Sequence, residues 1–231
     1  MNIVVTGGTK GIGRAINEAF AGIGFNIISC ARNQAELGLL NKELSGQYPE
    51  AKIFTQVCDM GKKEEVLNFA STIKQQFSKI DVLVNNAGVF MPGTLESEAD
   101  GTFETLMNLN IGGSYHITRA LLPLIKMCQG HIFNICSTAS ITAYTNGGSY
   151  CISKFAMLGM SKVLREELKP QGVRVTSVLP GATLTHSWEG TTLPETRFMN
   201  PKDIAKAIVE CYQLKTAVVE ELLLRPQLGD I

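Results

Sequence analysis

The sequence lacks the features that identify several classes of protein. It has 21 basic and 21 acidic side chains and a formal net charge of zero, so it offers no surplus of positive charge to nucleic acid or an anionic membrane. No apolar run reaches the roughly 18 residues of a membrane-spanning helix, and the first residues show no basic segment or cleavage site of a secretory signal. We therefore expect a cytoplasmic protein with no nucleic-acid or membrane partner.

Histidine is scarce, and the cysteines form no recognisable pairs. The chain has 3 histidines and 6 cysteines, but no CxxC pair and no spacing typical of metal ligands, so we expect no metal site. Isolated cysteines of this kind are typical of reduced thiols in a cytoplasmic enzyme. With 45% hydrophobic and 18% charged residues over 231 positions, the chain is predicted to fold as one globular domain spanning residues 1–231.

Strand-like and helix-like apolar patterns alternate along the whole chain. Strands are predicted over residues 3–5, 25–30, 51–57, 81–84, 131–136, 173–178 and 221–224. Helices are predicted over residues 12–23, 33–48, 62–77, 102–128, 150–169 and 201–214. Strands separated by helices form parallel units in an α/β sheet that is covered on both faces. Residues 181–200 have no regular pattern, and about 183–200 is a candidate lid.

A glycine-rich segment joins the first predicted strand to the first helix. It reads Thr6-Gly7-Gly8-Thr9-Lys10-Gly11-Ile12-Gly13, where glycines permit a tight turn and let a pyrophosphate approach the helix N-terminus. The spacing is GxxxGxG rather than GxGxxG, but the strand-turn-helix context is the one that nucleotide binding requires. The predicted cofactor contacts in this segment are Gly7, Thr9, Lys10, Gly11, Ile12 and Gly13.

The end of the second strand indicates which dinucleotide is bound. An NAD enzyme usually has an acid here, whose carboxylate holds the ribose 2′-hydroxyl. This chain has Cys30-Ala31-Arg32, and the next acid is Glu36. Arg32 can form a bidentate contact with a 2′-phosphate, and Lys10 adds a second cation. We therefore predict NADP(H) as the cofactor.

Two further strand ends add candidate cofactor contacts. Asp59, with Met60 beside it, follows the third strand, and its carboxylate either accepts a hydrogen bond from the adenine amino group or caps the next helix. Asn86, Ala87 and Gly88 follow the fourth strand, where small residues suit a backbone close to the cofactor, although a plain turn uses the same residues. We include both segments in the predicted cofactor site.

The candidate catalytic residues lie in the middle of the chain. Tyr150 and Lys154 are four residues apart, which places both side chains on one face of a helix. A lysine ammonium there favours the phenolate, so the tyrosine can exchange a proton near neutral pH. Ser137 follows an apolar run upstream of them. Asn110 lies among residues that form helices poorly, which marks either a functional position or a kink.

These segments together resemble the short-chain dehydrogenase/reductase family over essentially the whole chain. The resemblance rests on TGGTKGIG at 6–13, NNAG at 85–88, Asn110, Ser137, YCISK at 150–154 and Pro180-Gly181, in the family's order and spacing. It implies a three-layer, Rossmann-like doubly wound parallel sheet of order 3-2-1-4-5-6-7, with the cofactor bound across the point where the strand order reverses.

The resemblance also implies a role for each site residue. Tyr150 is the implied acid-base group, and Lys154 activates it and holds the nicotinamide ribose. Ser137 is implied to bond the carbonyl oxygen, and Asn110 to support a water relay to Lys154. The predicted contacts to the cofactor amide, which lie beyond the sixth strand, are Pro180, Gly181, Thr183 and Thr185.

The family resemblance further implies a homotetramer or homodimer. The helices predicted over 102–128 and 150–169 would then lie between subunits. The apolar positions that favour this burial are Leu121, Leu122, Ile125, Met157, Leu158 and Met160.

The substrate is the part of the function that the sequence determines least. The candidate lid is short and has one large aromatic residue, Trp188, which favours a small free ketone, aldehyde or secondary alcohol. An alternative is a 3-oxoacyl-(acyl-carrier-protein) reductase, but the helix ends that would dock an acidic carrier have Cys128, Gln129 and Gln171. A non-catalytic NADP-binding regulator is disfavoured because both the tyrosine and the lysine are present.

Overall fold

Seven parallel strands form the centre of the molecule. The computed structural model describes residues 1–185 and 188–230, so His186 and Ser187 of the predicted lid, and Ile231, lie outside the described residues. The strands are β1 (Asn2–Thr6), β2 (Asn26–Ala31), β3 (Ile53–Val57), β4 (Val82–Asn85), β5 (His131–Ile135), β6 (Arg174–Pro180) and β7 (Glu221–Leu224). They pair in the order β3-β2-β1-β4-β5-β6-β7, and every neighbouring pair is parallel. This confirms the predicted sheet.

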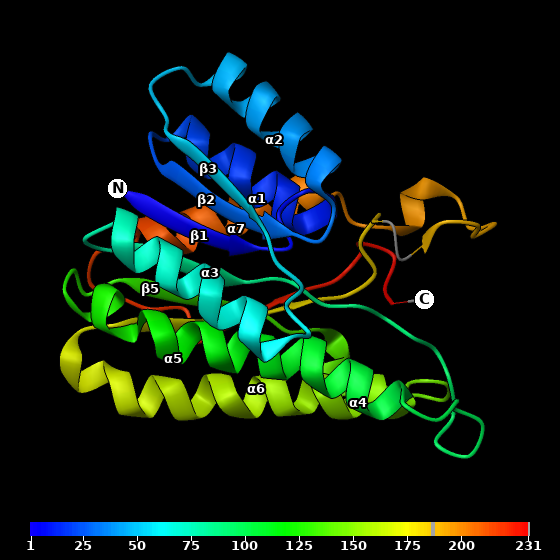
Figure 1. Ribbon diagram of the computed structural model, residues 1–231. Helices are drawn as coiled ribbons and strands as arrows, with labels where there is room; N and C mark the ends of the chain where they lie inside the picture. Colours follow the sequence, from blue (N-terminus) through cyan, green and yellow to red (C-terminus); the bar gives the residue numbers. More distant parts are fainter. Residues whose placement is uncertain (186–187, 231) are drawn as a thin grey trace.

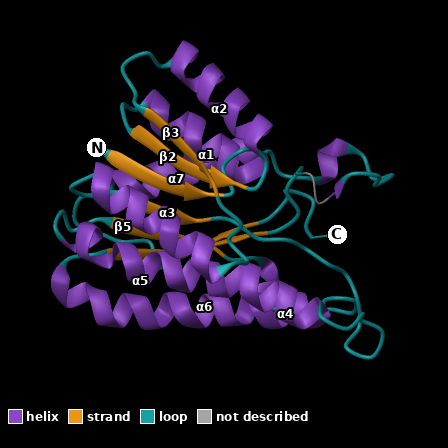
Figure 2. Ribbon diagram, in the orientation of Figure 1, coloured by secondary structure: helices purple, strands orange, loops and turns teal. Residues whose placement is uncertain are grey.

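Two layers of helices cover the sheet (Figure 1 and Figure 2). The helices are α1 (Gly11–Gly22), α2 (Gln34–Gln47), α3 (Lys63–Gln76), α4 (Thr102–Met107), α5 (Gly113–Lys126), α6 (Gly148–Leu168) and α7 (Pro201–Gln213). On one face α1 and α7 pack Ile16, Phe20 and Ile208 against the sheet; on the other, α3 and α5 bury Phe69 and Ile117. Each such side chain contributes about 1.5–3 kcal/mol on burial. Within the described residues, no helix is both long and apolar enough to cross a membrane.

The helix predicted over residues 102–128 is divided into three segments. A π-helical turn, Asn108–Gly112, separates α4 from α5, and Pro123 lies inside α5. Such turns insert an extra residue into the helical repeat and are frequent at functional sites. Here the turn contains Asn110, whose side chain faces the interior and is 1% exposed. The poor helix formers in the sequence therefore mark a change of helix type.

Most of the apolar residues predicted to lie between subunits are buried inside the single chain. Leu121 and Ile125 of α5, and Met157 and Leu158 of α6, are at most 6% exposed. These four residues therefore give no support to a subunit interface, because the helical repeat turns them towards the core of their own chain. The outer surfaces of α4, α5 and α6 instead expose Phe103, Tyr115, Ile152, Phe155 and Val163.

The carboxyl ends of the strands point to one edge of the sheet, on the right in Figure 1. The segment after β6 leaves this edge and returns to it, because Thr183 pairs with Met199. The amide of Leu184 donates to the carbonyl of Met199, and the amide of Met199 donates to the carbonyl of Ala182, both at 2.9 Å. These bonds hold the two ends of the predicted lid together at the edge where parallel sheets bind ligands.

Candidate active site

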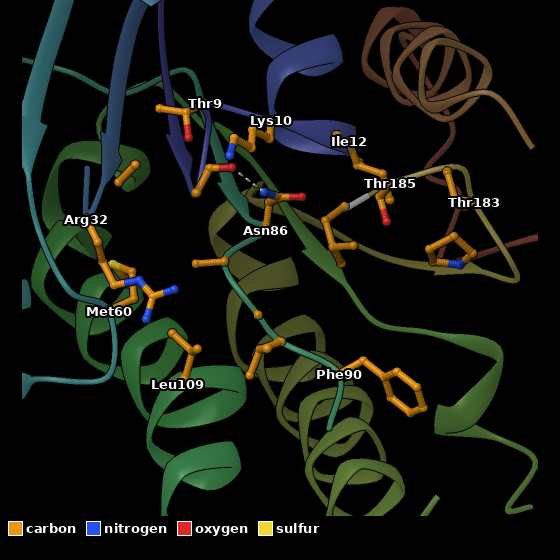
Figure 3. A pocket seen from close by; sticks show the side chains of 18 of the residues that line it. Thr9, Lys10, Ile12, Arg32, Met60, Asn86, Phe90, Leu109, Thr183 and Thr185 are labelled. Atoms are coloured by element: carbon orange, nitrogen blue, oxygen red, sulfur yellow. Dashed lines mark hydrogen bonds between the residues drawn. The ribbon is translucent and has the colours of Figure 1, made fainter. Parts of the chain in front are cut away.

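A cleft of about 900 Å³ opens at the carboxyl edge of the sheet. In Figure 3, Lys10 and Ile12 of the glycine-rich segment lie along one side, and Arg32 and Phe90 lie at opposite ends. The predicted site residues that line the cleft are Gly7, Thr9, Lys10, Gly11, Ile12, Arg32, Met60, Asn86, Ala87, Gly88, Tyr150, Lys154, Pro180, Gly181, Thr183 and Thr185. The fold therefore brings residues from distant parts of the sequence into one cleft.

The glycine-rich segment forms a tight turn before α1. Gly7 has a φ of +66°, a conformation that favours glycine. A Cβ on Gly13 would lie 2.3 Å from the carbonyl oxygen of Gly7, so a larger residue would push the loop away from the helix. The amide of Arg14 donates the first helical bond, to the carbonyl of Lys10 at 3.1 Å. The amides ahead of it belong to the helix N-terminus, where such groups bind anions such as a pyrophosphate.

Thr6 and Asn86 join this turn to the segment after β4. The Thr6 hydroxyl oxygen accepts hydrogen bonds from the amides of Asn86 and Ala87, both at 3.0 Å. The Asn86 side-chain amide donates to the carbonyls of Thr6 and Gly7, at 2.9 and 3.0 Å, and Figure 3 shows Asn86 in the middle of the cleft wall. These four bonds fix two loops that come from adjacent strands.

Tyr150 and Lys154 line the cleft, and Tyr150 contacts Phe90, which lies at the end away from Arg32 (Figure 3). Lys154 is only 6% exposed, and its ammonium donates to the carbonyl of Ile135 at 3.0 Å. Its Nζ atom lies 5.9 Å from the centre of the Tyr150 ring, and the Phe90 ring meets that of Tyr150 edge-on at 4.8 Å. A buried cation beside a tyrosine that borders the cleft is an arrangement that can exchange a proton with a ligand.

Asn110 holds the backbone of the cleft wall beside Lys154. Its side-chain oxygen accepts from the amide of Val89 at 2.8 Å, and its amide donates to the carbonyl of Val89 at 3.0 Å. The same amide donates to the hydroxyl of Ser153 at 2.9 Å. A Cβ on Gly88 would lie 3.1 Å from Asn110 Oδ1 and 3.6 Å from Lys154 Nζ, so the two side chains flank Gly88. Asn110 thus touches the cleft wall from behind and does not line the cleft.

Ser137 is set back from the cleft as well. Its hydroxyl oxygen accepts from the amide of Ala139 at 3.1 Å, and its amide donates to the hydroxyl of Ser140 at 3.2 Å. These bonds cap the short helix Thr138–Ser140. Ser137 is 8% exposed, and its neighbour Cys136 lines the cleft. Its predicted contact with a carbonyl oxygen stays a prediction.

Asp59 occupies a turn of its own and is not a helix cap. Its Oδ1 atom accepts from the amide of Gly61 at 2.9 Å, and its own amide donates to Glu65 Oε2 at 2.8 Å. The residue at the N-cap position of α3 is Lys62. The helix-cap interpretation is therefore wrong, because the chain makes one further turn before the helix. Met60 lines the cleft and Asp59 does not, and the adenine contact stays a prediction.

Two other titratable groups in the cleft stay protonated at neutral pH. Partial burial raises the pKa of the Tyr144 phenol above its usual value, and the nearby Tyr150 and Cys151 add to the shift. Burial also raises the pKa of the Cys136 thiol to about 11, although the Lys154 charge opposes the shift. Tyr144 is therefore available as a hydrogen-bond donor, and Cys136 as an apolar part of the wall.

Lys10 has a partner that sequence analysis did not anticipate. Its ammonium forms an ion pair with Glu36 Oε1 at 2.9 Å, and the Thr9 hydroxyl donates to Glu36 Oε2 at 3.0 Å. Glu36 lies in the first turn of α2, in the same cleft as Arg32. The nearest acid after the second strand thus reaches back across the cleft to the glycine-rich segment.

Other lining residues were also missed by sequence analysis. They are Ala31, Asn33, Gln34, Glu36, Cys58, Val89, Phe90, Leu109, Ile135, Cys136 and Tyr144, whereas Trp188, the aromatic residue noted in the candidate lid, lines the cleft as well. Adjacency to a motif was the available signal for several of them, since Val89 and Phe90 directly follow NNAG. Leu109 directly precedes Asn110 in the same way. No such signal marked Tyr144, because its place in the cleft depends on how separate segments pack.

Glu98 supports the N-terminus of α6 from outside the cleft. Its carboxylate accepts from the amide of Ser149 at 2.7 Å and from the Ser149 hydroxyl at 2.5 Å. Ser149 directly precedes Tyr150, and Glu98 belongs to the segment between β4 and α4 that also contains Phe90. These bonds therefore tie the segment beside Tyr150 to the helix that presents it.

Comparison with known proteins identifies the family. Residues 1–195 match the family model described as short chain dehydrogenase. The chain belongs to the short-chain dehydrogenase family. This short-chain dehydrogenase is 35% identical to a sepiapterin reductase of Chlorobaculum tepidum, over 99% of this chain and 97% of the relative. It is 32% identical to a 3-oxoacyl-[acyl-carrier-protein] reductase of Haemophilus influenzae, over 89% of this chain and 87% of the relative.

A solved structure supports the same assignment. An alcohol dehydrogenase of Thermococcus sibiricus complexed with 5-hydroxy-NADP superposes with a TM-score of 0.92 at 28% identity, and the match covers 98% of this short-chain dehydrogenase and 96% of that chain. Because its relatives are named as dehydrogenases and reductases, this short-chain dehydrogenase is an oxidoreductase.

Proposed function

We propose that the protein transfers a hydride between NADP(H) and a ketone, an aldehyde or a secondary alcohol, with Tyr150 as the acid-base group. The observation that supports this most strongly is the position of Tyr150, which lines the cleft close to the buried ammonium of Lys154. Solved structures of a Thermococcus sibiricus alcohol dehydrogenase and a metagenomic short-chain oxidoreductase were in complex with 5-hydroxy-NADP and NADP. They favour the same cofactor for this chain.

The cleft fits a dinucleotide phosphate. The turn at Gly7 and Gly13 leaves no room for a side chain, so the backbone amides at the start of α1 remain accessible to a pyrophosphate. At the far end of the cleft, Arg32 is exposed and points inward (Figure 3), where it can form two hydrogen bonds with a 2′-phosphate. Residues that could hold the 2′-phosphate, the pyrophosphate and the nicotinamide all line this one cleft, which supports the proposal.

The proposed chemistry divides between cofactor and protein. The bound nicotinamide supplies or accepts the hydride. In the direction of reduction, Tyr150 donates its phenolic proton to the substrate oxygen, and Lys154 stabilises the phenolate that remains. Ser137 donates a hydrogen bond to the same oxygen, where negative charge develops. Asn110 fixes the cleft wall at Val89 beside Lys154 and supports a water path by which the phenolate regains a proton.

We propose a small, free, ring-containing carbonyl compound as the substrate. Three aromatic side chains, Phe90, Tyr144 and Trp188, line the cleft together with Tyr150, and flat aromatic walls favour flat ligands. The relative named as a sepiapterin reductase, 35% identical over 99% of this chain, makes the pterin class the first to test.

Docking of an acyl carrier protein is disfavoured by ion pairs along α6 and directly after its last residue. Lys162 pairs with Glu221 at 2.9 Å, Arg165 pairs with Glu220, and Lys169 pairs with Glu166 at 2.5 Å. Because each cation already has an acidic neighbour, this surface has little free positive charge for an acidic carrier. The Haemophilus influenzae relative is nevertheless named as a 3-oxoacyl-[acyl-carrier-protein] reductase, so the test must include a carrier-bound 3-oxoacyl group.

The test is turnover of a carbonyl panel with NADPH, followed by absorbance at 340 nm. The panel contains sepiapterin, an aryl ketone, an aliphatic ketone, a free 3-oxoacyl thioester and the same acyl group on its carrier protein. Faster reduction of the two ring compounds than of the other substrates supports the proposal. A preference for the carrier-bound group establishes the alternative. Tight NADPH binding with no turnover of any substrate would indicate a regulator that does not catalyse a reaction.

We also propose that the protein is cytoplasmic and forms a homodimer or homotetramer. Five exposed apolar side chains on the outer surfaces of α4, α5 and α6 favour association; they are Phe103, Tyr115, Ile152, Phe155 and Val163. Light scattering after size exclusion, at micromolar concentration, measures the mass directly. A mass near 25.1 kDa, that of one chain, would contradict the oligomer.

A further inference from the structure

The end of the cleft that would receive the 2′-phosphate already contains a carboxylate. Glu36 forms an ion pair with Lys10 at 2.9 Å and accepts from the Thr9 hydroxyl at 3.0 Å. Thr9, Lys10, Arg32 and Glu36 all line the same cleft. One of the two cations predicted to bind the phosphate is therefore held by an acid of the protein itself.

Capping of α2 does not explain the position of the Glu36 carboxylate. The Asn33 side chain caps this helix by accepting from the amides of Ala35 and Glu36, at 2.9 and 3.2 Å. The Glu36 side chain instead reaches across to the glycine-rich segment, where it is less exposed than its partner, at 29% against 56% for Lys10. The ion pair therefore connects the glycine-rich segment to the first turn of α2, and both line the cleft.

We propose that Glu36 is a specificity-determining residue that competes with the 2′-phosphate of NADP(H) for Lys10. This role of Glu36 depends on the use of NADP(H) proposed above. When the phosphate approaches, Lys10 must leave Glu36 or share its charge between two anions, and the carboxylate repels the phosphate directly. NAD(H) has a neutral 2′-hydroxyl and avoids both effects. Glu36 thus lowers the preference for NADP(H) below what Lys10 and Arg32 alone would give.

The experiment measures the Kd of NADPH and of NADH by quenching of protein fluorescence, with the full-length protein at fixed ionic strength. Glu36→Gln removes the charge and keeps a group that can accept from Thr9. We expect this variant to bind NADPH about three- to tenfold more tightly. Its affinity for NADH should change by less than about twofold, because no charged group on NADH meets residue 36.

Glu43→Gln is the matched control. Glu43 lies on the same helix and pairs with Arg14 at 2.6 Å, so the control makes the same change in net charge away from Lys10. If Glu36→Gln and Glu43→Gln bound NADPH more tightly by the same factor, the change in net charge alone would explain the effect. That result would overturn the proposal. No tightening in Glu36→Gln, with its melting temperature unchanged, would overturn it as well.

A double-mutant comparison isolates the competition for Lys10. In a Lys10→Met background, most of the increase in NADPH affinity caused by Glu36→Gln should disappear. Residue 10 then has no ammonium for which Glu36 and the phosphate could compete. A gain that persists in full would contradict competition for Lys10. If the wild-type protein bound neither dinucleotide, the proposed function itself would fail, and that result is distinct from any difference between variants.

Discussion

The edge of the sheet where the strands begin and the edge where they end contain similar polar residues. The two edges use these residues differently. At the amino edge, the amide of Asn2 donates to Asp81 at 2.7 Å, Asn26 donates to Asn2 at 2.9 Å, and Lys79 pairs with Asp81 at 3.3 Å. At the carboxyl edge, polar side chains such as Asn86 and Asn110 bond to loop backbones and leave a cleft between them. At the amino edge the polar groups bond to one another. At the carboxyl edge they hold loops on either side of a cleft that a ligand can enter.

His131 and Lys154 show the same contrast for buried titratable groups. His131, at the start of β5, is 0% exposed and contacts the Thr176 hydroxyl at 2.8 Å, while Thr176 donates to the carbonyl of Val219 at 2.6 Å. Lys154 is similarly buried but keeps its ammonium beside Tyr150 and the cleft. Burial of a polar group therefore indicates function only where the group also reaches a space that a ligand can enter.

The largest effect should come from removing the proton donor at the carboxyl edge. Tyr150→Phe is expected to lower kcat by about 10²–10⁴-fold, because general acid-base catalysis contributes that much. NADPH binding should survive, since the ring remains. Steady-state kinetics and a binding titration test both parts.

Tyr144→Phe is the matched control for that variant, because Tyr144 also lines the cleft and its raised pKa keeps it protonated. It should lower kcat much less than Tyr150→Phe does. Equal losses in the two variants, or near-full activity of Tyr150→Phe, would show that Tyr150 is not the acid-base group.

A smaller effect should follow from reversing the charge at the end of β2. Ala31→Asp combined with Arg32→Ile adds repulsion and removes a bidentate contact, so the ratio of kcat/KM for NADPH to that for NADH should fall by about 10- to 10³-fold. Both cofactors are measured at one ionic strength. An unchanged ratio would mean that the 2′-phosphate does not lie at Arg32.

At the amino edge, the expected effect is on stability rather than turnover. Burial lowers the pKa of His131 from 6.5 to about 2, and the Arg174 charge adds to the shift. Above pH 6.5 the imidazole is neutral in both states. Below pH 6.5 only the unfolded state takes up the proton. The free energy of unfolding should therefore fall by about 2 kcal/mol between pH 7.5 and pH 5 because of this histidine.

His131→Gln should remove that pH dependence and leave kcat at pH 7.5 unchanged. Its amide can still donate to Thr176, which keeps the bond that the imidazole makes. Urea unfolding at pH 7.5, 6.0 and 5.0 measures the difference between the two proteins. A constant difference across this range would contradict a buried neutral histidine, and a loss of turnover would contradict the separation of the two edges.

The smallest effect concerns the support behind the cleft. Glu98→Gln weakens two charge-assisted bonds to Ser149, so kcat/KM should fall by about tenfold while NADPH affinity holds. Glu96→Gln is the control, since Glu96 is an exposed acid in the same segment. A loss in both variants, or in neither, would rule out a specific positioning role for Glu98.

The fold and the overall plan of the site follow from local patterns. Alternating apolar periods predicted the parallel sheet and its two helical layers, since burial of one face of each element decides both. The glycine-rich segment, Tyr150 and Lys154 could be placed because short spacings determine their geometry on a turn and a helix. The interface argument from Leu121 and Met157 failed because a helical stripe of apolar residues does not say which neighbour covers it.

The sequence by itself therefore determined the sheet order through the family resemblance, the glycine turn and the Tyr150–Lys154 pair. Only the tertiary structure decided that Glu36 pairs with Lys10 and that Glu98 accepts hydrogen bonds from Ser149. It also decided that Asn110, in a π-helical turn, bonds to the backbone of Val89. These contacts join residues at least 21 positions apart. No local pattern predicts them, because they depend on how loops from different strands pack at one edge of the sheet.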